Sequence, residues 1–283
     1  MILITGATGT VGSLLIPKLT AKGHNVRALT RNANVKFETG VQKVIGDLTD
    51  PKSLALAVKD VSQVFMVSDG TDLALKDRNI ISAAKAVGVQ HIVKLSVLSA
   101  SHMAKDPITQ WHMAGEDALR SSGVNWTMLR PNGFMSNALN WSHTIAAQSK
   151  VYAPFGEGCT SIVDPSDIAG VALACLTQAG HESKIYELTG PEALSVPEQV
   201  TILAKELGKS IEYVSITPEA SAKTLTTYGM KPDLAEAVIA MFASALDPRN
   251  GEVSNAINKV TAQSPKSFRE WAKYSRRAFE LYA

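Results

Sequence analysis

The feature that most constrains the fold of this chain is a glycine-rich loop between two apolar runs. Residues 1–16 read MILITGATGTVGSLLI, which predicts a short buried strand, a tight turn and a helix. A helix N-terminus presents unpaired N–H groups and a positive dipole end, and both attract the pyrophosphate of a dinucleotide. Gly6 would allow the tight turn, Gly9 a close phosphate approach, and Gly12 the packing of helix on sheet. An ordinary tight turn is the alternative. The predicted cofactor-binding residues of this loop are Gly6, Thr8, Gly9, Thr10, Val11 and Gly12.

Short β-branched runs alternate with helical spacing through the first two thirds of the chain. The expected strands are 1–5, 26–30, 43–45, 63–67, 91–96 and 126–130, and the expected helices between them are 10–22, 52–58, 73–87 and 113–122. Strand, helix and strand at this spacing predict right-handed crossovers and a mostly parallel sheet. The predicted fold class is therefore α/β, a Rossmann-type, doubly wound parallel sheet.

The pattern becomes mainly helical in the last third. Further helices are expected at 136–148, 166–176, 218–228, 233–245 and 266–281, with strands at 184–188 and 211–214. Ser195 to Glu198 has the capping-box pattern that begins another helix. We expect a dinucleotide-binding core at residues 1–190 and a small, mainly helical lobe at 191–283 that covers the substrate. Residues 131–160 are expected to contribute to the substrate pocket.

Composition and charge argue against several classes of partner. The 283 residues include 28 Lys and Arg against 26 Asp and Glu, a net charge of +2, which does not favour nucleic acid or an anionic membrane. No apolar run approaches the roughly 18 residues of a membrane span. Cys159 and Cys175 are the only cysteines, without histidines at zinc-site spacing, so we expect no disulfide framework, no metal site and a cytoplasmic location. No motif specifies an oligomeric state.

The second strand ends in an arginine where NAD-binding sites usually carry an acidic residue. Arg31 suits the 2′-phosphate of NADP, because a guanidinium can make two charge-assisted hydrogen bonds to it. A carboxylate at this position would repel the phosphate. The sequence therefore favours NADP(H) over NAD(H), with Lys36 as a second cation nearby. A solvated surface arginine is the alternative.

Other polar residues stand where predicted strands end, at the edge where doubly wound sheets bind ligands. Asp47 could accept from the adenine amine, or it could orient the turn before the next helix. Ser96 could bond a carbonyl or the nicotinamide amide, or be an ordinary serine at a strand end. The remaining residues expected beside the cofactor are Leu48, Val67 and Ser68.

Several motifs taken together resemble the NmrA-like family of atypical short-chain dehydrogenases/reductases. They are TGATGTVG at 5–12, TRN at 30–32, GD at 46–47, Trp111-His112 with Glu116 and Leu119, SG at 122–123, and LRP at 129–131 with Phe134, Met135 and Asn137. The resemblance runs to about residue 215. It implies NADP(H) binding through the glycine loop and Arg31, with the nicotinamide near Ser96 and Pro131. The family contains reductases of quinones, dyes and natural-product aromatics, and also redox-sensing regulators that catalyse nothing.

The chain departs from the wider superfamily in its proton donor. The usual Tyr-x-x-x-Lys would place its residues four and eight positions before Glu116, where this chain has His112 and Ile108, and residues 1–141 contain no tyrosine. His112 could donate to a substrate oxygen near neutral pH, or orient the ribose, or simply lie on the helix surface. The candidate catalytic residues are therefore His112 and Ser96.

Aromatic residues and a methionine cluster after the sixth predicted strand. They could line an apolar pocket for a flat, hydrophobic small molecule, or they could pack within the second lobe. The candidates are Trp111, Phe134, Met135, Trp141, Tyr152 and Phe155. The favoured function is an NADPH-dependent reductase of a conjugated or aromatic acceptor. The alternative is a non-catalytic NADP(H)-binding regulator that acts through a protein partner.

Overall fold

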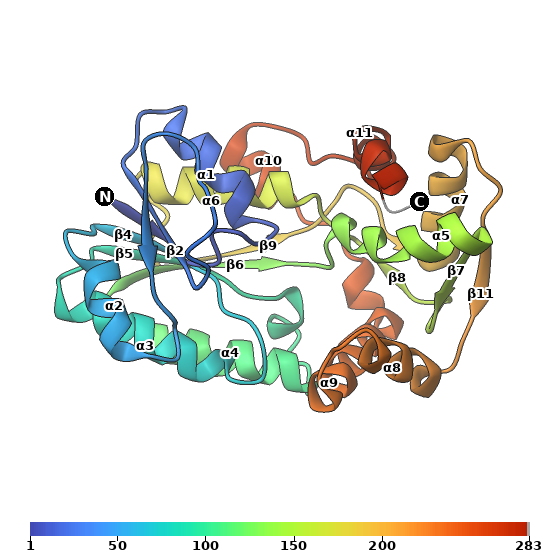
Figure 1. Ribbon diagram of the computed structural model, residues 1–283, viewed down its shortest axis with the longest axis horizontal. Helices are drawn as coiled ribbons and strands as arrows, with labels where there is room; N and C mark the ends of the chain where they lie inside the picture. Colours follow the sequence, from blue (N-terminus) through green and yellow to red (C-terminus); the bar gives the residue numbers. More distant parts are fainter. Residues whose placement is uncertain (282–283) are drawn as a thin grey trace.

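The computed structural model describes residues 1–281 and is built around a seven-stranded sheet in which every pairing is parallel (Figure 1). The strand order is β3-β2-β1-β4-β5-β6-β9. The strands are β1 (Ile2–Ile4), β2 (Val26–Thr30), β3 (Val41–Ile45), β4 (Gln63–Met66), β5 (His91–Leu95), β6 (Asn125–Pro131) and β9 (Lys184–Leu188). The chain moves outward from β1 to β3 and then returns to β4, so the order reverses beside β1. Ligands of doubly wound sheets bind at this reversal. The predicted fold class is confirmed.

Helices cover both faces of the sheet (Figure 1). One face packs against α1 (Gly12–Thr20), α6 (Pro165–Thr177) and α10 (Ala256–Thr261). The other packs against α2 (Pro51–Val58), α3 (Leu73–Ala86) and α4 (Pro107–Arg120). Alternate strand residues supply the two cores: Ile4 and Phe65 belong to the first, Leu3 and Val64 to the second. This alternation is the period of two that a strand imposes on its side chains.

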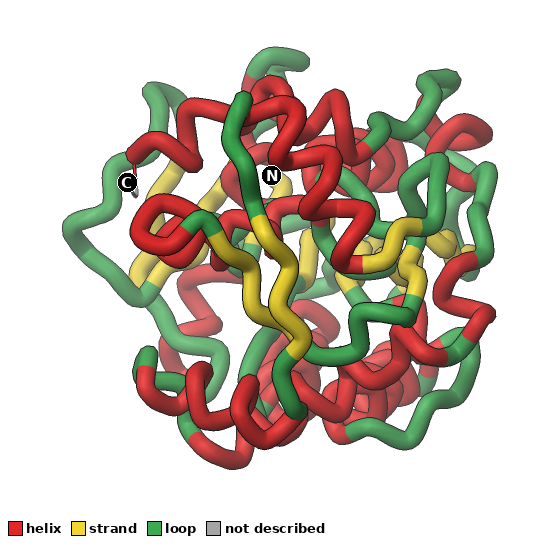
Figure 2. Tube along the Cα trace, turned by 90° about the vertical axis from the view of Figure 1, so that its right-hand side faces the viewer, coloured by secondary structure: helices red, strands yellow, loops and turns green. Residues whose placement is uncertain are grey.

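A second lobe has its own apolar core. It contains β7 (Lys150–Ala153) paired in parallel with β11 (Glu212–Ser215), which Figure 2 shows nearest the viewer, and β8 (Cys159–Thr160) paired antiparallel with β10 (Leu194–Ser195). Its helices are η2 (Met135–Trp141), α5 (Ser142–Gln148), α7 (Val196–Leu207), α8 (Pro218–Thr227), α9 (Pro232–Phe242), η3 (Ala243–Leu246), η4 (Pro248–Gly251) and α11 (Phe268–Leu281). Within residues 1–281, no helix has the length and apolar composition that a membrane span requires.

The six strands predicted in the first 130 residues are all present, each within two residues at either end. One helix differs more. α4 begins at Pro107 rather than at 113, because Asp106 Oδ1 accepts a hydrogen bond from the Thr109 N–H at 2.9 Å and so caps an earlier start. The helix predicted at 136–148 is divided into the 3₁₀ segment η2 and α5. The short elements β7, β8, β10 and α10 were not predicted, since segments of two to six residues carry little periodicity.

Candidate functional site

The glycine loop lies at the carboxyl end of β1, where the strand order reverses. Gly6 has φ +59°, and a Cβ there would approach the Val67 side chain to 3.0 Å. A Cβ on Gly12 would lie 2.3 Å from the Gly6 carbonyl oxygen, so α1 can pack this closely only on a glycine. At Gly9 a Cβ would meet only the Gly6 oxygen, at 3.2 Å, and the outer side is open. The loop therefore has an accessible backbone surface at Gly9.

The start of α1 has donors that the protein does not use. No side chain caps this helix, and in the part of the chain that the structure describes the N–H groups of Thr8, Thr10 and Val11 have no acceptor. The Gly9 N–H is different, because it donates to the Gly6 oxygen at 2.9 Å. Unused N–H groups and the positive end of the helix dipole together form an anion site.

The segment after β2 forms the next part of the site. Arg31 is exposed there, and Lys43 Nζ holds the following loop by donating to the carbonyl oxygens of Ala33 at 2.6 Å and Val35 at 3.2 Å. Lys36 lines a hollow of about 310 Å³ together with Thr8 of the glycine loop and Ser13 of α1. Lys36 thus lies beside the loop that would hold the pyrophosphate, and contact of Arg31 with a 2′-phosphate stays a prediction.

Asp47 takes part in the turn before α2. Its Oδ1 accepts from the Thr49 N–H and from Thr49 Oγ1, both at 2.8 Å, and these hydrogen bonds lower the pKa of the Asp47 carboxyl. With these hydrogen bonds Asp47 orients the turn before α2. Contact of Asp47 with adenine stays a prediction. Leu48, beside it, is half-buried, and its carbonyl accepts from Asn79 Nδ2 at 2.8 Å.

The end of β4 lies under the glycine loop. The Thr5 hydroxyl accepts from the Val67 N–H at 2.7 Å and donates to the Val67 oxygen at 2.9 Å, which fixes β1 and β4 together at this edge. Ser68 follows, and its buried hydroxyl has no hydrogen-bond partner among the described residues. A buried polar atom without a partner is costly, so Ser68 is suited to a polar ligand group at this edge.

Ser96 belongs to a buried cluster around Glu116 of α4. Its hydroxyl donates to Glu116 Oε1 at 2.6 Å, and Arg130 donates to both carboxylate oxygens, from Nε at 2.9 Å and from Nη2 at 2.5 Å. Burial raises the pKa of the Glu116 carboxyl, but the hydrogen bonds from Arg130 and Ser96 outweigh burial and hold that pKa below its usual value. The cluster joins the ends of β5 and β6 to α4. The Ser96 proton is committed to Glu116, so only its oxygen lone pairs remain for a ligand.

His112 lies on the inner side of α4, next to another buried charge pair. Only 9% of the residue is exposed, and its Nδ1 atom has no partner among the described residues. Lys94 Nζ and Asp77 Oδ2, both fully buried, are 2.5 Å apart nearby. Burial, helped by the Lys94 charge, lowers the pKa of His112 well below its usual value. The lowered pKa favours the neutral imidazole, and the use of His112 as a proton donor stays a prediction.

The aromatic candidates do not form one wall. Met135 is buried in the core of the second lobe and Trp141 packs against that core, whereas Phe134 packs against the core of the sheet. Tyr152 on β7 donates its hydroxyl to Gln148 Oε1 at 2.7 Å. Trp111 and Phe155 are half-buried on α4 and after β7, and Pro131 is buried at the end of β6. Met135 is buried, as the packing alternative expects. A pocket role for the six candidates stays a prediction.

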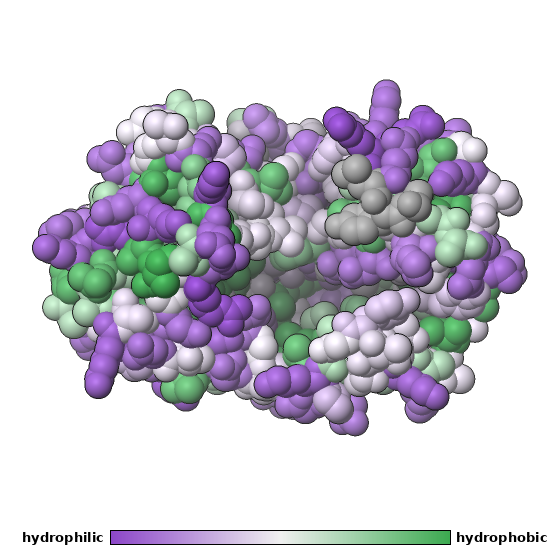
Figure 3. All heavy atoms as spheres, in the orientation of Figure 1, coloured by the Kyte–Doolittle hydropathy of each residue, from purple (hydrophilic) through white to green (hydrophobic). Residues whose placement is uncertain are grey.

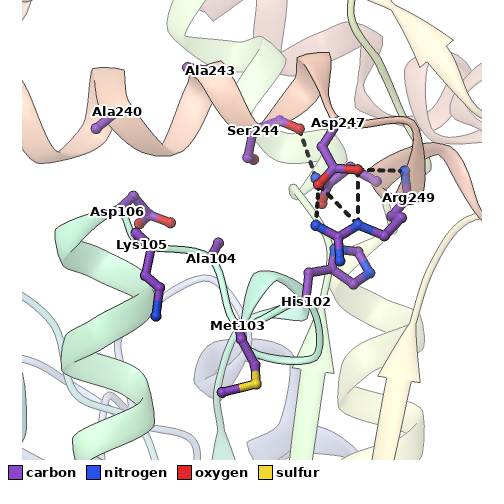
Figure 4. Close-up of a pocket in the computed structure, with 11 residues that line it drawn as sticks. His102, Met103, Ala104, Lys105, Asp106, Ala240, Ala243, Ser244, Asp247 and Arg249 are labelled. Atoms are coloured by element: carbon purple, nitrogen blue, oxygen red, sulfur yellow. Dashed lines mark hydrogen bonds and ion pairs between the residues drawn. The ribbon is translucent and has the colours of Figure 1, made fainter.

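The structure also contains a cavity that no sequence signal indicated. Its volume is about 350 Å³, and it lies between residues 102–106, which follow β5, and residues 240–250 of the second lobe (Figure 4). The surface is visibly hollowed between the two lobes (Figure 3). The two walls are more than 130 residues apart in sequence, so no local pattern could have paired them.

The sequence profile of the NmrA-like family matches residues 1–275. The chain belongs to this family. The NmrA-like resemblance inferred from the motifs at residues 5–12 and 129–131 is thereby confirmed.

Similar proteins match the NmrA-like chain over nearly its whole length. An NAD(P)H azoreductase from Xenophilus azovorans is 35% identical over 283 residues, which covers 99% of each protein. A (4-alkanoyl-5-oxo-2,5-dihydrofuran-3-yl)methyl phosphate reductase from Streptomyces griseus is 36% identical, again over 99% of each. The structure of an NADPH-dependent quinone oxidoreductase from Escherichia coli complexed with NADPH has a TM-score of 0.85 and 27% identity, and the match covers 97% of this chain and 99% of that one.

The residues of this NmrA-like chain fit a dinucleotide. The uncapped start of α1 faces the edge of the sheet, the outer side of Gly9 is open, and the Ser68 hydroxyl is unsatisfied. No cluster of three or more histidine, cysteine or acidic side chains with metal-binding geometry occurs in residues 1–281.

Proposed function

We propose that this chain, an NAD(P)H-dependent oxidoreductase of the NmrA-like family, is an NADPH-dependent reductase of flat, conjugated or aromatic acceptors such as quinones and azo dyes. The observation that carries the proposal is the uncapped, glycine-lined start of α1 at the edge where β5 and β6 also end. The azoreductase, the Streptomyces griseus reductase and the NADPH-bound quinone oxidoreductase support it, because each resembles this chain from end to end.

The residues around the site would mainly bind and orient. When bound, the nicotinamide supplies the hydride. The loop N–H groups hold the pyrophosphate, and the Glu116 cluster keeps the ends of β5 and β6 in a fixed relation. His112 is neutral, and Ser96 donates to Glu116. We therefore infer that water, rather than a Tyr/Lys pair, protonates the reduced acceptor. A quinone or azo group accepts hydride before it needs a proton, so such acceptors tolerate this arrangement.

We also propose that NADP(H) is preferred over NAD(H). Arg31 is exposed directly after β2, Lys36 is exposed and lines the hollow beside Thr8, and the 2′-phosphate is the group that distinguishes the two cofactors. The cytoplasmic location expected from the two cysteines stays a prediction.

A second candidate is a redox-sensing regulator that binds NADP(H) without turnover. The neutral, buried His112 in place of a tyrosine proton donor favours it, since a sensor needs no acid. Under this alternative the dinucleotide site would be intact and a protein partner would respond to it.

The test is to follow nicotinamide absorbance while the protein is mixed with NADPH and a panel of quinones, azo dyes and triphenylmethane dyes. Acceptor-dependent oxidation of NADPH is the expected result. Tight NADPH binding, seen by calorimetry, without oxidation by any member of the panel would favour the regulator. The Gly9→Val variant, in which the pyrophosphate surface is blocked, is the control for oxidation that does not depend on this site.

A further inference from the structure

The loop between β2 and β3 carries both cations that are proposed to select NADP(H). Residues 31–40 form no helix or strand, and Arg31 and Lys36 are exposed within them. Residues 35–38 of this loop form one wall of the hollow beside the glycine loop. A loop without tethers samples many conformations, and a ligand that needs one of them loses affinity to the ordering. How residues 31–36 are held therefore bears on the choice of cofactor.

The hydrogen bonds inside this loop are local. The Asn34 N–H donates to Asn32 Oδ1 at 2.9 Å, and the Val35 N–H donates to the Asn32 carbonyl oxygen at 3.3 Å. The Asn32 N–H donates to Thr30 Oγ1 at 3.1 Å, at the end of β2. These bonds shape a turn, but they do not attach the turn to another part of the molecule.

Lys43 of β3 supplies that attachment. Its Nζ atom donates to the carbonyl oxygen of Ala33 at 2.6 Å and to that of Val35 at 3.2 Å, so one ammonium group spans the turn. Among the described residues, every other hydrogen bond of residues 31–36 stays between residues 30 and 35. The Lys43 side chain is therefore the tether of the stretch that begins with Arg31 and ends with Lys36.

The position of Lys43 in the sheet explains why it reaches the loop. Lys43 is the register partner of Ala28 on β2, and Ala28 belongs to the core between the sheet and α1. Register partners in neighbouring strands point to the same face of a sheet, so Lys43 points to the face that α1 covers. β3 is the edge strand and Lys43 is exposed there, so its ammonium group is free to bond the loop beside it.

The second half of the loop is fixed independently of Lys43. Phe37 packs against the core between the sheet and α1, and Glu38 Oε1 accepts from Thr20 Oγ1 of α1 at 2.7 Å. The Glu38 carbonyl oxygen also accepts from the Val41 N–H at 3.2 Å. Loss of the Lys43 ammonium should therefore loosen residues 31–36 and leave residues 37–40 in place.

We propose that Lys43 is a positioning residue for the selection of NADP(H): by holding the carbonyl oxygens of Ala33 and Val35, it orders the stretch with Arg31 and Lys36 before the cofactor binds. The inference rests on the proposed preference for NADP(H) and adds the residue that prepares the loop for it. The Lys43 ammonium is committed to two main-chain oxygens, so it acts through the loop and not on the 2′-phosphate itself.

The first measurement is hydrogen exchange of the protein without cofactor, at sub-second labelling times. The Asn34 and Val35 amides should exchange several-fold faster in Lys43→Met than in the parent, because the turn that protects them is no longer attached. Residues 37–40 should exchange as in the parent. Lys43→Arg should restore the protection, since a guanidinium can also donate to two oxygens. Lys43 is exposed on an edge strand, so we expect both variants to fold.

The second measurement is calorimetric titration of the same variants with NADPH and with NADH. Lys43→Met should bind NADPH about three- to tenfold more weakly than the parent and NADH with nearly the parent affinity, and Lys43→Arg should bind NADPH nearly as the parent does. Lys22→Met is the matched control, since it removes an exposed lysine from the turn between α1 and β2. An equal loss of NADPH affinity in this control would reveal general charge attraction and overturn the inference.

The two measurements together separate a tether from a direct contact. Weaker NADPH binding with parent-like exchange at Asn34 and Val35 would mean that Lys43 meets the phosphate itself, and would overturn the positioning role. Faster exchange with parent affinity for NADPH would overturn it as well. In both cases the preference for NADP(H) would stand. Equal affinities of the parent for NADPH and NADH would instead contradict that proposed preference, and the inference with it.

Discussion

Gly9 and Gly12 have different surroundings although they belong to one loop. A Gly9 side chain would point to open space beyond the Gly6 oxygen, whereas a Gly12 side chain would collide with that oxygen at 2.3 Å. The free energy of unfolding of Gly9→Val should therefore lie within about 1 kcal/mol of the parent value. The variant should nevertheless lose NADPH binding. Gly12→Ala should cost about 1–3 kcal/mol of stability, as overpacking does. Denaturant unfolding and NADPH titration measure the two effects, and tight NADPH binding by folded Gly9→Val would contradict the cofactor assignment.

The choice of dinucleotide should depend on Arg31. A charge-assisted hydrogen bond contributes about 1.5–3 kcal/mol, and ~1.4 kcal/mol is tenfold in affinity. Arg31→Ala should weaken NADPH roughly ten- to a hundredfold and leave NADH nearly unchanged. Calorimetry with both cofactors tests this, with Lys209→Ala in the second lobe as the control. If the parent protein bound NADPH and NADH equally, the predicted NADP preference would be wrong. If Arg31→Ala still preferred NADPH, Lys36 would be the residue that contacts the phosphate.

Among the elements, α7 is secured at its start by a capping box. The Ser195 N–H and hydroxyl donate to Glu198 Oε2 at 2.8 and 2.7 Å, and the Glu198 N–H donates back to Ser195 Oγ at 3.4 Å. Ser195→Ala should lower the free energy of unfolding by about 1 kcal/mol, because a helix N–H loses its partner. Ser210→Ala, in the loop after α7, should change little. Equal unfolding midpoints for the two variants would show that the cap contributes nothing.

The last helix, α11, is attached to the sheet core by an ionic cluster. The Tyr274 hydroxyl donates to the buried Asp164, and Lys266 Nζ lies 2.6 Å from Asp167 Oδ1 and 2.8 Å from Ser166 Oγ. These carboxylates stand at the N-terminus of α6, where the helix dipole also stabilises them. Lys266, two residues before α11, therefore connects the two lobes.

At the scale of the whole molecule, buried histidines should make stability fall in mild acid. Burial lowers the pKa of His112 and also of His91, so the folded state takes up protons less readily than the unfolded state. Stability is therefore retained above the ordinary histidine pKa of 6.5 and decreases as pH falls below it, by at most about 1.4 kcal/mol per pH unit for each group.

His112→Gln isolates the largest of these effects. In this variant the loss of unfolding free energy between pH 7.5 and about pH 5.5 should be smaller than in the parent, although Lys94 and Asp77 remain beside the site. His143→Gln, an exposed position on α5, should leave the pH dependence as it is. The measurement is urea unfolding across the pH range, and parallel curves for parent and His112→Gln would contradict the assigned cause.

The two lobes should respond together to the cofactor. If residues 191–283 include a lid over the edge of the sheet, NADPH should slow hydrogen exchange both in the loop at residues 6–12 and in part of that lobe. Hydrogen-exchange mass spectrometry with NADPH at saturating concentration tests this. Protection confined to the glycine loop would argue against a lid.

The sequence by itself determined the features that depend on residues close together along the chain. The period of apolar residues gave rise to the strands and helices of the first 130 residues, the glycines at 6–12 set the loop after β1, and Ser195 with Glu198 set the start of α7. Each arises from steric limits or hydrogen bonds within a few residues, so each is visible in a short stretch of sequence.

Only the tertiary structure decided what the other side chains face. Ser96 could have met a ligand or been an ordinary serine at a strand end, and the packing of α4 against β5 and β6 brings Glu116, which Arg130 also binds, to its hydroxyl. Met135 suited either a pocket or the packing of the second lobe, and the tertiary structure buries it in that lobe's core. The cavity joins residues 102–106 to 240–250. Contacts between residues so far apart depend on how the layers pack, and no local period of the sequence encodes that packing.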